Sequence, residues 1–144
     1  MILLDANLLL YIKIQNYPQH KASKAWFEQQ VADSVRIGLP WHSLLAFLRV
    51  GTNPKVYSSP LSIEDAWMQI NEWLSLQNIW IPSPTDRHQN VLGDLLKKSQ
   101  ASANLIPDAH LAALAIEHGL EVYTTDTDFA KFPNCKWKNP LQQT

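Results

Sequence analysis

Short hydrophobic runs alternate along this chain with longer segments in which hydrophobic residues recur every three or four positions. The short runs are typical of strands buried on both faces, and they occupy residues 1–4, 35–39, 79–81, 120–123 and 135–137. The longer segments predict helices over residues 7–12, 18–32, 41–50, 63–74, 86–100 and 108–118. Strands alternating with helices of about ten or more residues predict an α/β domain, with a mainly parallel central sheet and helices on both faces.

Polar residues and glycines mark several of the predicted helix ends. Asn7 is placed to cap the first helix, and Ser62 with Asp65 three residues later has the spacing of a capping box. Asp108 is predicted to open the sixth helix, which Gly119 ends.

Composition narrows the class of protein. The chain has 144 residues, of which 46% are hydrophobic and 17% charged, with no linker-like stretch. We therefore expect one domain over residues 1–144, with disorder only in the last few residues. A single cysteine, Cys135, cannot form an internal disulfide, and the opening Met-Ile-Leu-Leu falls far short of the roughly 20 residues that span a membrane, so we expect a soluble cytoplasmic protein. The net charge of -1 means that any nucleic-acid binding must rest on a local surface.

Three aspartates stand where a hydrophobic run meets a turn or a helix start. They are Asp5, Asp108 and Asp126. Ligands of parallel sheets bind outside the carboxyl ends of the strands, where Asp5 and Asp126 are predicted to lie. Three carboxylates in one pocket repel each other unless a cation lies among them, so the pattern indicates a divalent-metal site. Carboxylates without Cys or His companions favour Mg²⁺ or Mn²⁺ over zinc.

Each aspartate also has an ordinary structural explanation, as a helix cap or a turn former. Only their joint placement at one sheet edge favours a metal site. The five histidines form no metal-binding pair or cluster in the sequence, so surface or capping roles are expected for His20, His42, His88, His110 and His118. Neither a nucleophile elbow nor a glycine-rich phosphate loop is present.

Three separated motifs resemble the PIN-domain ribonucleases, specifically the VapC toxins of bacterial type II toxin-antitoxin systems. The motifs, in the order of that family, are Leu4-Asp5-Ala6-Asn7, residues 107–115 and residues 124–129. The resemblance implies an endoribonuclease that uses Mg²⁺ or Mn²⁺ to activate water for attack on a phosphodiester. The matching positions imply catalytic and metal-binding roles for Asp5, Asp108 and Asp126, with Asp128 as a supporting metal-binding acid. They imply that Asn7 and Thr124 orient these carboxylates.

One position departs from the PIN pattern. The glutamate usual in the third helix is replaced by Ala46, with only Ser43 and His42 nearby. The site is then a carboxylate short, which leaves open a catalytically weak or inactive PIN-fold module that binds RNA or a protein partner.

The resemblance also implies partners. They are an RNA substrate such as tRNA or ribosomal RNA, a VapB-like antitoxin, and a second copy of the chain in a homodimer. A third reading, a phospho-accepting α/β domain with Asp5 as acceptor, lacks a lysine at a predicted strand end.

Overall fold

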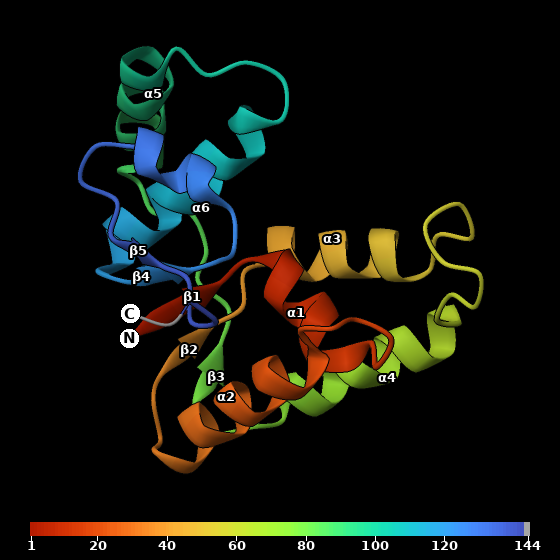
Figure 1. Ribbon diagram of the computed structural model, residues 1–144. Coiled ribbons are helices and arrows are strands. Elements are labelled where there is room, and N and C mark those ends of the chain that lie inside the picture. The colour runs from red at the N-terminus through yellow and green to blue at the C-terminus, as the bar shows by residue number, and fades with distance from the viewer. Residues whose placement is uncertain (143–144) are drawn as a thin grey trace.

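A computed structural model describes residues 1–142 of the chain (Figure 1). Its strands are β1 (Ile2–Leu4), β2 (Ile37–Gly38), β3 (Ile79–Trp80), β4 (Glu121–Tyr123) and β5 (Trp137–Lys138). Its helices are α1 (Ala6–Lys13), α2 (His20–Ala32), α3 (Trp41–Gly51), α4 (Ile63–Leu74), α5 (His88–Ser99), α6 (Leu105–His118) and the short 3-10 helix η1 (Thr127–Lys131). The disorder expected of the last few residues concerns Gln143 and Thr144, which lie outside the described residues.

The five strands form one parallel sheet in the order β3-β2-β1-β4-β5. The predicted α/β fold is thus confirmed. The fully hydrophobic strand β1 lies at the centre, where Leu3 pairs with Gly38 on one side and Val122 on the other. Because β1 and β4 are parallel neighbours, their carboxyl ends lie side by side, and Asp5 N donates to the carbonyl of Tyr123 at 3.1 Å.

Helices cover both faces of the sheet and enclose two hydrophobic cores. Helices α1 to α4 lie on one face, whereas α5, α6 and η1 lie on the other (Figure 1). The alternation of β1 divides its side chains between the cores, because Ile2 and Leu4 join the first and Leu3 the second. A strand buried in this way has no polar position until Asp5, which therefore marks the edge of the sheet.

Two predicted helix starts were wrong. The N-cap of α1 is Asp5, whose Oδ1 accepts from Ala6 N at 2.8 Å, and Asn7 lies inside the helix. Helix α6 begins at Leu105, so Asp108 lies in its first turn rather than opening it. Pro107 is tolerated there because the first N–H groups of a helix have no partner within the helix.

Other predicted ends agree with the structure. Ser62 Oγ accepts from Asp65 N at 3.0 Å, as expected for the cap of α4. Gly119 ends α6 with a φ of 68°, the left-handed conformation that favours glycine. The last strand begins at Trp137, two residues later than predicted. Among the described residues, no helix combines the length and hydrophobicity that crossing a bilayer requires.

Candidate metal centre

Asp5 follows β1 and is held by groups from its own turn and from the end of β4. Its Oδ1 accepts from Ala6 N, and its Oδ2 accepts from the hydroxyl of Thr124 at 2.9 Å. The amide of Asn7 makes a longer contact to the same Oδ2 at 3.5 Å. These donors fix the orientation of the Asp5 carboxylate.

The buried hydroxyl of Thr124 connects the two strand ends. Besides donating to Asp5, Thr124 Oγ1 accepts from Asn7 Nδ2 at 3.1 Å and from Asp126 N at 3.0 Å. Asp126 in turn accepts at Oδ1 from Asp128 N at 2.9 Å, which makes it the N-cap of η1. A continuous set of hydrogen bonds therefore positions the acids that follow β1 and β4.

Three carboxylates come close together beside this set. Asp108 from α6, Asp126 and Asp128 each offer an oxygen that lies within 4.8 Å of the other two. Asp5 stands outside this tight group but is near enough for its charge to raise the pKa of Asp108. The structure thus brings all four predicted acids to one edge of the sheet. Asp128, predicted to be only a supporting metal-binding acid, lies in the tight group itself, whereas Asp5 lies beside it.

The pKa of Asp108 reflects this crowding. Burial is the largest cause of its rise to about 7, and the charges of Asp5, Asp126 and Asp128 raise it further. Burial also raises the pKa of Asp5, although hydrogen bonds from Thr124 and Ala6 act in the opposite direction. Both shifts disfavour the charged form of these two carboxylates, which a bound cation would favour.

The donor chemistry fits a hard divalent cation. All the converging groups are carboxylate oxygens, the ligand type that Mg²⁺ and Mn²⁺ prefer. Lys131 Nζ lies 3.1 Å from Asp128 Oδ1, but both side chains are about half exposed, so this ion pair neutralises little. Beside the cluster, the buried Asn7 Oδ1 has no hydrogen-bond partner within residues 1–142.

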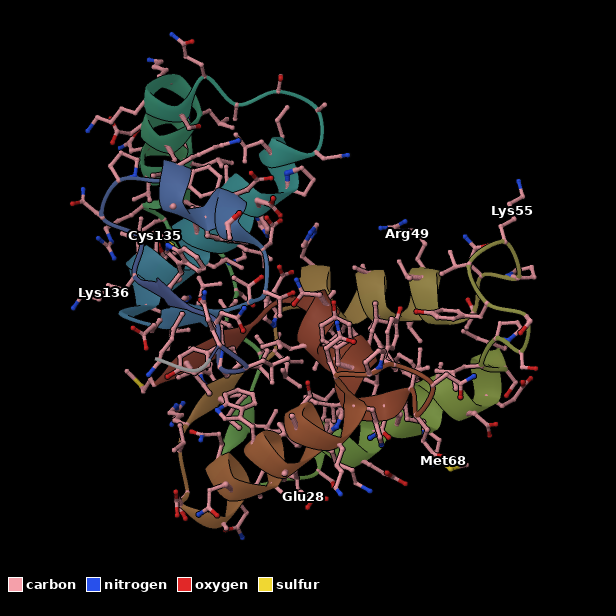
Figure 2. The ribbon with its side chains drawn as sticks, in the orientation of Figure 1. Glu28, Arg49, Lys55, Met68, Cys135 and Lys136 are labelled. Carbon is pink, nitrogen blue, oxygen red and sulfur yellow. The ribbon has the colours of Figure 1, made fainter. Side chains whose placement is uncertain are left out.

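Helix α3 approaches the carboxylate cluster but contributes no acidic side chain to it. Ala46 is half-buried, and Ser43, one turn earlier, donates to the carbonyl of Leu4 at 2.8 Å. This bond anchors α3 to the residue before Asp5. His42, in the first turn, is close enough to Asp5 for each charge to shift the pKa of the other group. Arg49 lies farther along α3 and points outward into solvent (Figure 2).

A group of three histidines and Glu117, of which His42 borders the acids, was not predicted from the sequence. His88 Nδ1 lies 2.6 Å from Glu117 Oε2, and His88 Nε2 lies 3.1 Å from His110 Nδ1. The ring of His110 packs edge to face against that of His42, with centroids 5.7 Å apart. The surface or capping roles expected for His88 and His110 were therefore wrong. A usable signal was the seven-residue spacing of His110 and Glu117, which places both on one face of a helix.

Comparison with known proteins supports a family assignment. A model of the PIN domain matches residues 2–134. Ribonuclease VapC33 of Mycobacterium tuberculosis is 40% identical over 143 residues, which cover 99% of this chain and 100% of the relative. Ribonuclease VapC37 of the same organism is 37% identical over 140 residues, with 97% of each chain covered.

Solved structures share the fold at lower identity. VapBC2 from Rickettsia felis, bound to a DNA fragment from its promoter, superimposes with a TM-score of 0.68 at 19% identity, covering 96% of this chain and 98% of the other. VapBC-1 from nontypeable Haemophilus influenzae gives 0.67 at 18% identity, covering 99% and 100%. On the family match and the sequence relatives together, the chain belongs to the PIN-domain family, in the branch of the VapC ribonucleases.

Proposed function

We propose that this chain is a metal-dependent endoribonuclease that hydrolyses RNA phosphodiester bonds as the toxin of a toxin-antitoxin pair. One observation carries the proposal: Asp108, Asp126 and Asp128 converge within 4.8 Å at the carboxyl edge of a parallel sheet, with Asp5 beside them. The ribonuclease names of relatives that align over nearly the whole chain support the same activity. The alternative, an inactive module of the same fold, gains no support from these relatives.

The four aspartates would hold Mg²⁺ or Mn²⁺. When bound, the ion would offset charge on the scissile phosphate and lower the pKa of the attacking water. Asp108, whose pKa is raised to about 7, would be held as a ligand in its deprotonated form, so metal binding there would be accompanied by release of its proton. Thr124 and Asn7 hold the Asp5 carboxylate in one orientation, so that less freedom is lost when an ion binds.

Two protein partners are part of the proposal. The solved neighbours are VapBC complexes, so a VapB-like antitoxin is proposed to bind and inhibit this chain. A homodimer is proposed from the same likeness to the family. The RNA substrate is proposed to be a structured RNA, such as tRNA or ribosomal RNA.

Cleavage assays with purified protein test the metal-dependent activity. The protein is incubated with bacterial tRNA and with ribosomal RNA in Mg²⁺ or Mn²⁺, with and without EDTA. We expect cleavage that EDTA abolishes, and we expect Asp5→Asn and Asp108→Asn each to lower the rate by about a hundredfold or more. Asp94→Asn is the matched control, because Asp94 is an exposed acid paired with Lys98 on α5. Cleavage that survives chelation, or that survives in both site variants, would refute the proposal.

A further inference from the structure

A chain of side-chain contacts leads from a buried glutamate to the edge of the carboxylate cluster. It starts at Glu117 on α6, continues through His88 on α5 and His110 on α6, and ends at His42 in the first turn of α3. Three different helices contribute to it. The proposed metal chemistry uses none of these four residues.

The inner part of this chain is rigid because its polar atoms are bonded. Glu117 Oε1 accepts from both the N–H and the hydroxyl of Thr85, at 2.9 and 2.6 Å, and Oε2 faces His88. A carboxylate only accepts, so His88 Nδ1 carries the hydrogen of that contact. His88 Nε2 in turn faces His110 Nδ1 at 3.1 Å. Both rings are thereby held in position.

His42 differs from the other two histidines. Within the described residues neither of its ring nitrogens has a hydrogen-bond partner, and neither is sealed from solvent. Its ring is instead held by the edge-to-face contact with His110, while Ser43, the next residue, fixes this turn of α3 to β1. An imidazole that is held in position and has free ring nitrogens can form a hydrogen bond with a ligand that binds at the acidic cluster.

The position of His42 on α3 brings it close to the proposed RNA-binding site. His42 and Ala46 are four residues apart, so they share one face of the helix, and Ala46 adds no polar group there. The residue after His42, Ser43, bonds the carbonyl of Leu4 next to Asp5, and the His42 ring packs on His110, which lies two residues from Asp108. These contacts place the imidazole beside the acids, and the charges of Asp5 and His42 also shift the pKa of each other's group. An RNA strand whose phosphate is held at the four aspartates is therefore expected to lie near this ring.

We infer that His42 is a substrate-contacting residue that donates a hydrogen bond to an oxygen of the ribose-phosphate backbone of bound RNA. His110, His88 and Glu117 are positioning residues that hold the imidazole in place. The inference rests on the proposed nuclease function. An imidazole donates at least one N–H in either protonation state, so the contact requires only an acceptor oxygen, either on a phosphate or on a 2′-hydroxyl.

The first test compares His42→Ala and His42→Gln with the wild-type chain. We expect His42→Ala to lower kcat/KM on tRNA by about 10- to 100-fold, because a hydrogen bond in the active site is lost. His42→Gln keeps an N–H donor and should recover most of that loss. Mg²⁺ affinity measured by calorimetry should stay within about twofold in both variants, since no carboxylate changes. His20→Gln serves as the control, because the His20 ring contacts the Tyr11 carbonyl rather than an acid of the cluster.

Three results would overturn the inference. They are wild-type activity in His42→Ala, an equal loss in His42→Gln, and a fall in Mg²⁺ affinity that matches the fall in cleavage. RNA binding measured by fluorescence anisotropy in Ca²⁺ separates the inference from the nuclease proposal. If no cleavage is found in Mg²⁺ or Mn²⁺, but the wild-type chain binds RNA in Ca²⁺ and His42→Ala weakens that binding, the contact stands although the nuclease function fails. If binding is unchanged in His42→Ala, the contact is refuted.

Modified substrates identify the acceptor oxygen. A short oligoribonucleotide spanning the mapped cut is prepared with a 2′-deoxy sugar or with a phosphorothioate at the cut. The substitution that removes the contacted oxygen should slow the wild-type chain and have little added effect on His42→Ala. Either coupling supports the inference and names the oxygen, whereas additive effects for both substrates would overturn it.

A double-mutant cycle tests the positioning residues. We expect Glu117→Gln to lower kcat/KM by about threefold to tenfold in the wild-type background and by much less in the His42→Ala background. A merely structural effect of Glu117→Gln would reduce activity equally in both. Equal losses would therefore show that the contacts from Glu117 do not act through His42.

Discussion

The two ends of α6 carry carboxylates in opposite electrostatic states. In the first turn, burial and three neighbouring acids raise the pKa of Asp108 to about 7. At the last turn, burial alone would raise the pKa of Glu117, but hydrogen bonds from Thr85 and His88 outweigh it and hold that pKa below its usual value. The helix dipole favours the reverse pattern at both ends, by about 0.3–1 kcal/mol each, so the local partners decide.

The difference between these carboxylates separates a structural acid from a functional one. The protein gives Glu117 three hydrogen-bond contacts and so stabilises its charge internally. It gives Asp108 three further acids instead. A carboxylate whose charged form the fold disfavours is a candidate for binding a cation, because strongly perturbed carboxylates are concentrated at functional sites.

The largest expected effect on stability comes from removing the carboxylate of Glu117, whose charge is stabilised by hydrogen bonds within the protein. Glu117→Ala leaves donors of Thr85 and His88 without an acceptor, and we expect it to lower the free energy of unfolding by about 3 kcal/mol in urea denaturation. Asp94→Ala is the control, because its ion pair with Lys98 at 3.1 Å is more than half exposed and should contribute under about 1 kcal/mol. Equal unfolding midpoints for the two variants would show that the hydrogen bonds to Glu117 contribute no more to stability than the exposed ion pair of Asp94.

A smaller effect on stability is expected at Asn7, which orients the Asp5 carboxylate but does not neutralise its charge. Asn7→Ala removes the amide that contacts both Asp5 and Thr124. We expect Mg²⁺ affinity, measured by calorimetry, to fall by about 10- to 100-fold, while the metal-free protein unfolds at nearly the same urea concentration. A large loss of stability with unchanged Mg²⁺ affinity would show that Asn7, like Glu117, stabilises the fold rather than the metal site.

The pH dependence of stability is expected to give the smallest effect, because Asp108 is only half-buried and solvent screens much of the shift in its pKa; the sign of the effect follows from Asp108. The ordinary pKa of an aspartate is 3.8 and that of Asp108 is about 7, so between these values the folded protein holds a proton that the unfolded chain has released. Stability of the metal-free protein should therefore fall as pH rises from 4 to 7. Melting temperatures measured in EDTA should drop by a few degrees over this range, less so in Asp108→Asn.

Excess Mg²⁺ should restore the melting temperature at pH 7 and above, because the ion replaces the lost proton. His20→Gln is the control for general effects of pH. A melting temperature that rises with pH in the metal-free protein, equally in the wild-type chain and in Asp108→Asn, would show that Asp108 is not the group responsible.

The fold and the acid edge were predictable because both depend on local patterns. The hydrophobic run before Asp5 and the strand before Thr124 identify two strand ends, and parallel pairing brings such ends together. Asp126 and Asp128 follow within a few residues, so their position is nearly fixed by the chain itself.

The histidine contacts could not be predicted in the same way. His88 lies 22 residues from His110 and 29 from Glu117, and only the packing of α5 on α6 decides which of their faces meet. The start of α6 was missed for a different reason. A proline in the first turn looks like a boundary in the sequence, although the helix tolerates it there.

The bond from Ser43 to the Leu4 carbonyl makes α3 and the end of β1 one mechanical unit. The end of β1 is in turn bonded to the end of β4, because Asp5 N donates to the Tyr123 carbonyl and the Asp5 carboxylate accepts from Thr124. A displacement of α3 would therefore be transmitted to the acids at both strand ends, starting from a helix that carries none of them.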